Sequence, residues 1–153
     1  MDALQNSLVQ LTTLLPATSR RWLKLLDARL GDFEIGSAAV VPLVIIARSG
    51  GRLNQAALAE RVGVVGPALV RTLDALADLD LVHREVDADD RRSKRLRLTE
   101  AGAALVARLE ARLVEIRAEV FAGIPAQDVE AALRVHQALL DSLQASSSAD
   151  ASE

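Results

Sequence analysis

The sequence predicts a mainly α-helical chain with one small β-hairpin, and three observations support this fold class. Half of the 153 residues are hydrophobic but only 2% are aromatic, and abundant Ala, Leu, Arg and Glu favour helices. Apolar residues recur every three or four positions at both ends of the chain. Two short strand-like segments flank a charged turn within residues 81–98. A chain of this length is expected to form one domain with a sizeable core.

The first helical region, residues 1–34, carries a 3.5-residue apolar repeat, which is typical of a helix that lies along another helix. Pro16 interrupts this region, and proline is tolerated in the first turn of a helix but not in its interior. The region therefore contains either two helices in the same phase or one helix kinked at Pro16. The repeat consists of Leu4, Leu8, Leu11, Leu15, Trp22 and Leu25.

The central region, residues 35–98, is the predicted compact part of the chain. Its pattern indicates three helices followed by a strand, a charged turn and a second strand. Asn54 is a favourable N-cap for the second of these helices, and Gly63 ends that helix. The expected helices span about residues 37–48, 55–62 and 66–79, and the expected strands span residues 81–86 and 94–98.

The second and third of these helices show the spacing of a helix-turn-helix. Ala59 allows the two helices to approach closely, and Gly63, four residues later, permits a left-handed turn. An ordinary helical hairpin would show the same pair. The β-hairpin that follows directly favours a winged helix-turn-helix, an arrangement whose second helix enters the major groove of duplex DNA. Apolar contacts around the turn are expected from Leu58, Val62, Val64 and Leu69.

Two groups of residues are candidates for DNA contact. The first lies on the outward face of the third helix, where Arg71 can pair with guanine. The second is the hairpin tip, where five of the seven residues 91–97 are basic although the net charge of the chain is −3. An Arg there suits a narrow minor groove, and Asp90 is placed to orient Arg92. A solvated hairpin surface is the alternative. The candidate DNA-binding residues are Pro67, Arg71, Thr72, Asp90, Arg91, Arg92 and Lys94.

The C-terminal part is predicted to form two more helices, the first of which is capped by Thr99 and stopped by Gly123. The second carries apolar residues in steps of four and three, with His136 on the same face as an interface residue. Residues 1–34 and 99–144 are therefore assigned to a helical dimerisation region, since long terminal helices beside a compact domain have little else to bury against. Packing within one chain is the alternative. Residues 145–153 are expected to be disordered.

Three segments together resemble the MarR family of bacterial regulators, and most closely its SlyA branch: residues 58–64, 69–76 and 89–99. The resemblance implies a homodimer on pseudo-palindromic operators, often controlled by small aromatic carboxylates that bind between the dimerisation and DNA-binding parts. By position, Asp90 and Arg92 match the wing-tip pair of the family, and Arg71 with Pro67 matches its recognition helix. Trp22 is a candidate ligand-binding residue, with filling of the interface as its alternative role.

Two departures from the family pattern lie in or next to the helix-turn-helix. Its recognition helix opens with the apolar sequence Val64–Ala68 where the family usually has polar residues, so fewer direct base contacts are expected there. Asp80 stands where the family commonly has Gly, and Asp tolerates a left-handed backbone better than most residues do.

Other function classes are disfavoured by what the sequence lacks. It has no Cys and two distant His, so no cofactor and no metal site is predicted. Nothing in it combines a nucleophile with a base, and the chain is therefore predicted not to be an enzyme. The longest uncharged run, residues 35–47, is too short to span a bilayer, and no signal peptide is evident, which predicts no membrane association and a cytoplasmic location. A helical module whose wing binds an acidic protein is the remaining alternative.

Overall fold

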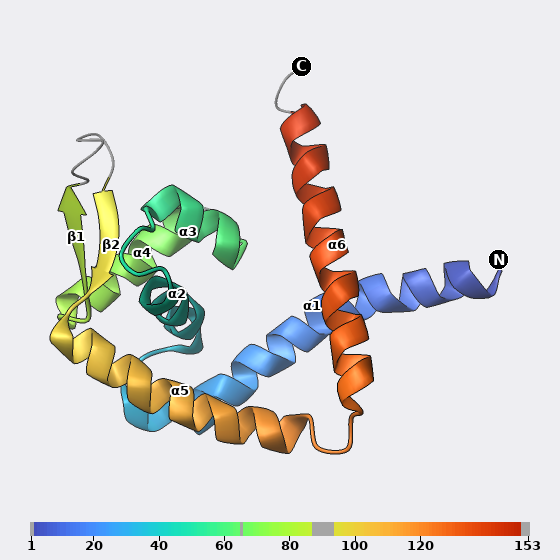
Figure 1. Ribbon diagram of the computed structural model, residues 1–153, viewed down its shortest axis with the longest axis horizontal. Helices are drawn as coiled ribbons and strands as arrows, with labels where there is room; N and C mark the ends of the chain where they lie inside the picture. Colours follow the sequence, from blue (N-terminus) through green and yellow to red (C-terminus); the bar gives the residue numbers. More distant parts are fainter. Residues whose placement is uncertain (1, 65, 87–93, 151–153) are drawn as a thin grey trace. The chain divides into compact units, whose positions relative to one another are not determined.

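The computed structural model describes residues 2–64, 66–86 and 94–150, the last four of these without their side chains (Figure 1). The chain forms two compact units, residues 1–114 and residues 115–153. The order of elements confirms the predicted fold class, mainly helical with a β-hairpin after the helix-turn-helix. The elements are α1 (Ala3–Arg29), the 3₁₀ helix η1 (Gly31–Phe33), α2 (Ser37–Arg48), α3 (Gln55–Val62), α4 (Gly66–Asp78), β1 (Val82–Val86), β2 (Lys94–Leu98), α5 (Glu100–Val120) and α6 (Ala126–Asp150).

The N-terminal region is one helix, α1, which runs through Pro16. Of the two predicted arrangements, the structure therefore excludes two separate helices. Asp2 caps α1, since its side chain accepts a hydrogen bond of 2.7 Å from the backbone N–H of Gln5. Pro16 removes one backbone hydrogen bond but leaves the turns on either side intact.

The start of α2 is stabilised by a residue of α1. Gly36 occupies the N-cap of α2 and has no side chain to cap it. Asp27 of α1 fills this role, because its Oδ1 accepts a 2.8 Å hydrogen bond from the backbone N–H of Ser37. The carboxylate also stabilises the positive end of the α2 dipole. This contact fixes the direction in which α2 leaves α1.

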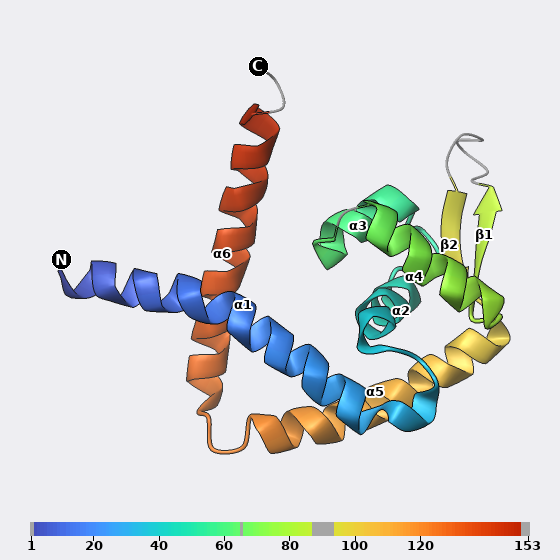
Figure 2. The same cartoon turned by 180° about the vertical axis from the view of Figure 1, so that it is seen from behind.

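The core of the first unit lies between α2, α4 and the hairpin. In Figure 2, α4 lies across α2 and leads into β1. One apolar face of α4, formed by Leu69, Leu73 and Leu76, is buried, whereas Leu79, three residues after Leu76, follows the end of α4 and is 51% exposed. Among the side chains that form this core cluster, the most deeply buried are Leu43 and Ile46 of α2, Leu58 of α3, Leu69, Leu73 and Leu76 of α4, and Leu96 of β2. Each such burial contributes about 1.5–3 kcal/mol.

The hairpin pairs β1 and β2 in antiparallel register, with Val82 opposite Leu98 and Val86 opposite Lys94. Leu53 extends the pairing on the other edge of β2, because its carbonyl accepts a 2.8 Å hydrogen bond from the N–H of Leu96. The turn before β1 has Asp80 at a φ of 54°, the left-handed backbone that the sequence predicts for this position. The hairpin is thus attached to the segment before α3 as well as to α4.

The second unit contains the end of α5, a turn at Gly123 with a φ of 81°, and α6. α6 continues to Asp150, whereas the sequence predicts disorder from residue 145. Ala145 is a strong helix former and favours this continuation, and the hydroxyl of Ser146 donates to the carbonyl of Ser142 at 3.0 Å, one turn earlier in the same helix. Among the described residues, none of the helices combines the length and the apolar character that crossing a membrane requires.

Candidate nucleic-acid interface

The turn between α3 and α4 has the geometry predicted for a helix-turn-helix. Asn54 caps α3 through a 2.9 Å hydrogen bond from the N–H of Ala57 to its Oδ1. Gly63 ends α3 at a φ of 71°, and its N–H donates to the carbonyl of Ala59 at 2.9 Å. A side chain at position 63 would have open space, so the backbone conformation alone requires glycine. Val64, expected to pack around the turn, is 39% exposed.

The candidate residues of α4 occupy different environments. Pro67 and Arg71 are exposed, opposite the buried leucine face. Thr72 is half-buried, and its hydroxyl donates to the carbonyl of Ala68 at 3.2 Å, which leaves it less available for another partner. The structure therefore leaves Pro67 and Arg71 more accessible than Thr72.

An ion pair that the sequence analysis missed joins α4 to the hairpin. Arg84 of β1 donates from Nη2 to Oδ1 of Asp74 at 2.7 Å. The Arg84 side chain is only 28% exposed, so this contact is better shielded from solvent than an ordinary surface pair. An Asp on α4 and an Arg ten residues later give no recognisable sequence signal, because the turn between them decides whether they meet.

A second cluster lies on the hairpin, where Glu85 lies between His83 and Arg97. Glu85 Oε1 lies 2.8 Å from His83 Nε2, and Glu85 Oε2 lies 2.6 Å from Arg97 Nε. The hydrogen bond from His83 and the charge of Arg97 lower the pKa of the Glu85 carboxyl below its ordinary value. The cluster ties β1 to β2 across the ladder.

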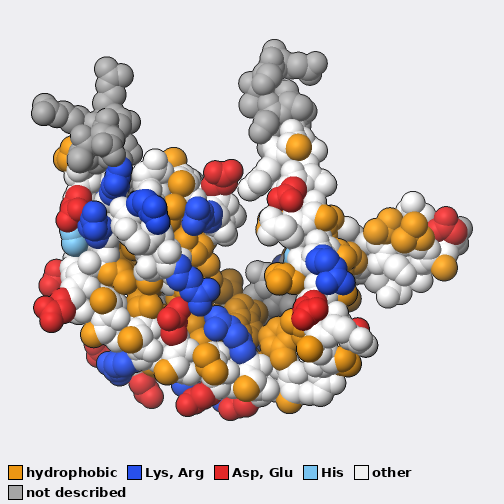
Figure 3. All heavy atoms as spheres, in the orientation of Figure 1, with side chains coloured by type: hydrophobic (Ala, Val, Ile, Leu, Met, Phe, Trp, Pro, Cys, Tyr) orange, Lys and Arg blue, Asp and Glu red, His pale blue; other side chains and the backbone are white. Residues whose placement is uncertain are grey.

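Basic side chains gather over this part of the molecule. Figure 3 shows several Lys and Arg side chains over the hairpin and the helices beside it. Lys94, at the start of β2, is exposed. Asp90, Arg91 and Arg92, the candidate residues of the wing tip, lie outside the described residues. The described part alone thus presents a local positive surface on a chain whose net charge is −3.

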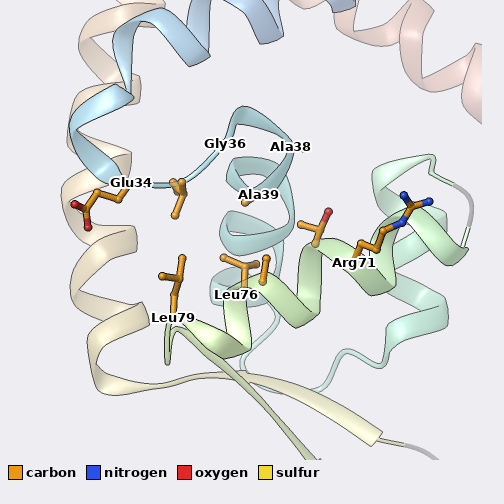
Figure 4. Close-up of a pocket in the computed structure, with 10 residues that line it drawn as sticks. Glu34, Gly36, Ala38, Ala39, Arg71, Leu76 and Leu79 are labelled. Atoms are coloured by element: carbon orange, nitrogen blue, oxygen red, sulfur yellow. The ribbon is translucent and has the colours of Figure 1, made fainter.

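Two cavities flank α4. The first, of about 330 Å³, lies between α4 and the start of α2, and Figure 4 shows its lining, with Leu76 and Leu79 near one end and Arg71 at the other. The second, of about 340 Å³, lies between α1, α2 and the helix-turn-helix, and Ser19 and Leu23 of α1 contribute to it. Ala38 and Thr72 line both cavities, so a molecule in either one would contact the recognition helix.

Trp22, the candidate ligand-binding residue, is half-buried on α1 and is absent from the lining of both cavities. The neighbouring Leu23 faces the second cavity instead. Within the described ranges, no cluster of three or more His, Asp or Glu side chains could hold a metal ion. The geometry therefore brings together an exposed Arg71, a wing fixed to α4 by an ion pair, and cavities on the other sides of that helix.

Known proteins match this chain both in the helix-turn-helix region and over most of its length. A family model described as the MarR family matches residues 43–93, which contain the helix-turn-helix and the first part of the wing. The structure of the transcriptional regulator PA3341 is similar at 37% sequence identity and a TM-score of 0.77. That likeness covers 88% of this chain and 98% of the other.

Two further solved structures were determined with bound molecules. CouR from Rhodococcus jostii RHA1, bound to p-coumaroyl-CoA, is 25% identical with a TM-score of 0.78, over 85% of this chain and 91% of CouR. A mutant of MarR from E. coli, complexed with operator DNA, is 23% identical with a TM-score of 0.74, over 91% of this chain and 99% of that one. At that identity the second likeness shows the fold alone.

Proposed function

Since the chain belongs to the MarR family of DNA-binding transcriptional regulators, which are not enzymes, we propose that it binds a pseudo-palindromic operator as a homodimer and responds to a small ligand. The proposed DNA binding is supported chiefly by the exposed Arg71 on α4, together with the wing that Arg84 fixes to the same helix. Assignment to the SlyA branch and a cytoplasmic location remain predictions from the sequence.

The proposed DNA contacts come from two elements. α4 enters the major groove, where the guanidinium of Arg71 pairs with a guanine edge and Pro67 and Thr72 lie beside it. The wing follows the backbone into the neighbouring minor groove, with Lys94 at its base and Asp90, Arg91 and Arg92 at its tip. The wing Arg residues gain most where the minor groove is narrow, so the operator is expected to be rich in A·T pairs beside each major-groove contact.

The homodimer is supported by apolar side chains that remain exposed on the terminal helices. Leu4 and Leu8 of α1 are 66% and 42% exposed, and Leu133 and Leu140 of α6 are 68% and 55% exposed. These side chains follow the helical repeat of each helix, so they form faces rather than scattered positions. A symmetric partner that covers both faces places two recognition helices at a fixed separation, as a two-fold operator requires.

The proposed effector is a small aromatic carboxylate in the cavity between α1 and the helix-turn-helix. The cavity of about 340 Å³ is lined mostly by apolar groups, among them Leu23, Pro42 and Val62, and Ser19 contributes a hydroxyl to its lining. A ligand there would contact α1 and α4 at once, and so it would bias the position of the recognition helix. The p-coumaroyl-CoA bound to CouR, a protein of similar structure, supports the proposal that this chain also binds a small molecule.

The function is tested by selecting bound sequences from a random DNA pool. We expect enrichment of two inverted half-sites about one helical turn apart. Binding should fall steeply as salt rises, because phosphate contacts release counterions. If no DNA is retained even at low salt, the alternative of a module that binds an acidic protein is favoured and DNA binding is refuted.

A further inference from the structure

We infer that the first two turns of α4 read thymine methyl groups by apolar contact, with Val70 as the specificity-determining residue beside Arg71. This inference rests on the proposed DNA binding and specifies which chemical groups of the DNA bases the protein recognises. Two of the three sides of α4 already contact other parts of the protein or line a cavity. Leu69, Leu73 and Leu76 face the core, and Thr72 and Ala75 line the cavity beside α2.

The remaining side of α4 faces the wing and the solvent. Asp74 marks it, because its carboxylate is held by Arg84 of β1. Val70 precedes Asp74 by one turn of helix and therefore projects from the same side. It is 36% exposed, and Pro67, one turn earlier, is exposed as well. A groove contacted by both α4 and the wing must lie against this side, so Val70 meets the edges of the bases.

The hydrogen-bonding capacity of this surface is small. Within α4, all of which is described, Arg71 is the one Lys or Arg. The Thr72 hydroxyl is bonded to the carbonyl of Ala68, and the Asp74 carboxylate is bonded to Arg84. Arg71 can specify guanine, but no other side chain near the start of the helix can donate to a base and accept from it.

Apolar contact then provides the remaining discrimination. In the major groove, thymine is the base that presents a methyl group, and small apolar side chains recognise it. The branched side chain of Val70 is stiff at χ1, so it offers its two methyl groups in one fixed position. We therefore expect each half-site to contain a guanine read by Arg71 and, within about two base pairs of it, a thymine read by Val70.

The test replaces thymine by deoxyuridine at one position at a time in the selected operator, which removes only the methyl group. In fluorescence anisotropy titrations, the wild-type protein should lose about fourfold in affinity at the thymine that Val70 contacts, the effect of one buried methyl group. Equal binding of every substituted operator would overturn the inference while leaving DNA binding intact. Failure to bind any operator would refute the proposed function instead.

Substitutions at Val70 test whether this residue causes the preference for thymine over deoxyuridine. Val70→Ser should bind the thymine and deoxyuridine operators equally, and Val70→Thr, which keeps one methyl group and the branched shape, should show an intermediate ratio. Val41→Ser is the matched control, because Val41 is a 39% exposed valine on α2, outside the proposed DNA contacts and the dimerisation region. It should retain the wild-type ratio. A preference for thymine that persists undiminished in Val70→Ser would overturn the role of Val70.

Discussion

Arg84 of β1 and Asp74 of α4 form a 2.7 Å ion pair that joins the wing to the recognition helix. The two residues lie on consecutive elements that are connected by the turn at Asp80, whose φ is 54°. The left-handed turn lets the chain reverse between α4 and β1, and the ion pair then fixes the angle between strand and helix. A direct side-chain contact therefore links the two proposed DNA-contacting elements.

The first prediction concerns this pair. Asp74→Ala is expected to weaken operator binding several-fold, because the wing is no longer held in register with α4, and to lower the free energy of unfolding by about 0.5–1 kcal/mol. Urea unfolding and DNA titration of Asp74→Ala, Arg84→Ala and the double variant measure the coupling energy.

The ion pair between Arg48 and Glu110 is a suitable control. It joins α2 to α5 at 3.0 Å and is more exposed, at 68% and 40% for the two side chains. Glu110→Ala should leave operator affinity unchanged and cost less stability than Asp74→Ala. If the two variants affect DNA binding equally, the Asp74–Arg84 pair has no special role in holding the wing.

The second prediction is the pH dependence of the hairpin. His83 and Arg97 lower the pKa of Glu85 below its ordinary value of 4.5 in the folded state. A lowered carboxyl pKa stabilises the fold above the unfolded value, and this contribution is lost as the pH falls through the folded value. Wild type should therefore be more stable than Glu85→Gln at neutral pH, and the difference should shrink below the ordinary pKa of 4.5. A difference in Tm that stays constant from neutral pH to well below that value would contradict this linkage.

The third prediction concerns the junction of β2 and α5. A Cβ atom at Gly102 would clash with the carbonyl oxygen of Leu81, which already accepts a 3.1 Å hydrogen bond from the N–H of Thr99. Gly102→Ala must shift backbone and should lower the free energy of unfolding by about 1–3 kcal/mol.

Gly66→Ala is the control for this substitution, since a Cβ atom there meets nothing within 4 Å. It should leave stability unchanged or raise it by up to about 1 kcal/mol through helix propensity. Urea unfolding of both variants and of the wild type measures these free energies. Equal midpoints for Gly102→Ala and wild type would show that the junction relaxes without cost.

Local signals in the sequence predicted much of this fold. The N-cap at Asn54, the left-handed residues Gly63 and Asp80, and the cap at Thr99 each depend on residues within a few positions, and the structure contains all of them. Thr99 caps α5 as expected, because its hydroxyl accepts a 2.9 Å hydrogen bond from the N–H of Gly102. Capping and turn chemistry act over such short distances that a single sequence is sufficient to find them.

Contacts between elements could not be predicted in this way. The cap of α2 comes from Asp27, ten residues before the N–H that it accepts from, and the Asp74–Arg84 pair also spans ten residues. Both depend on how the chain reverses between elements. The exposure of Leu79 has a similar cause, since the apolar period of α4 continues past the residue where the helix ends. Candidate base contacts on α4 were recognisable, but the contacts that orient them were not.

The fourth prediction addresses the wing tip. Arg92→Ala should weaken operator binding by about 1–3 kcal/mol, because a tip Arg pairs with the narrow minor groove. A DNA titration at fixed salt measures the loss. Arg61→Ala, on the exposed side of α3, is a control that removes the same charge elsewhere. Equal losses for the two variants would indicate a general effect of charge rather than a contact at the wing tip.

The last prediction concerns dimerisation through α6. Leu133 is 68% exposed in the isolated chain and lies on the apolar face of α6, so Leu133→Glu should place two carboxylates in a symmetric interface. Loss of leucine burial on both protomers removes about 3 kcal/mol, which raises the dimer Kd by about a hundredfold or more. Ala138→Glu, also exposed on α6 but off that face, should leave the dimer intact. Sedimentation velocity across a concentration series separates the two variants, and a Leu133→Glu dimer as stable as wild type would exclude this face of α6 from the interface.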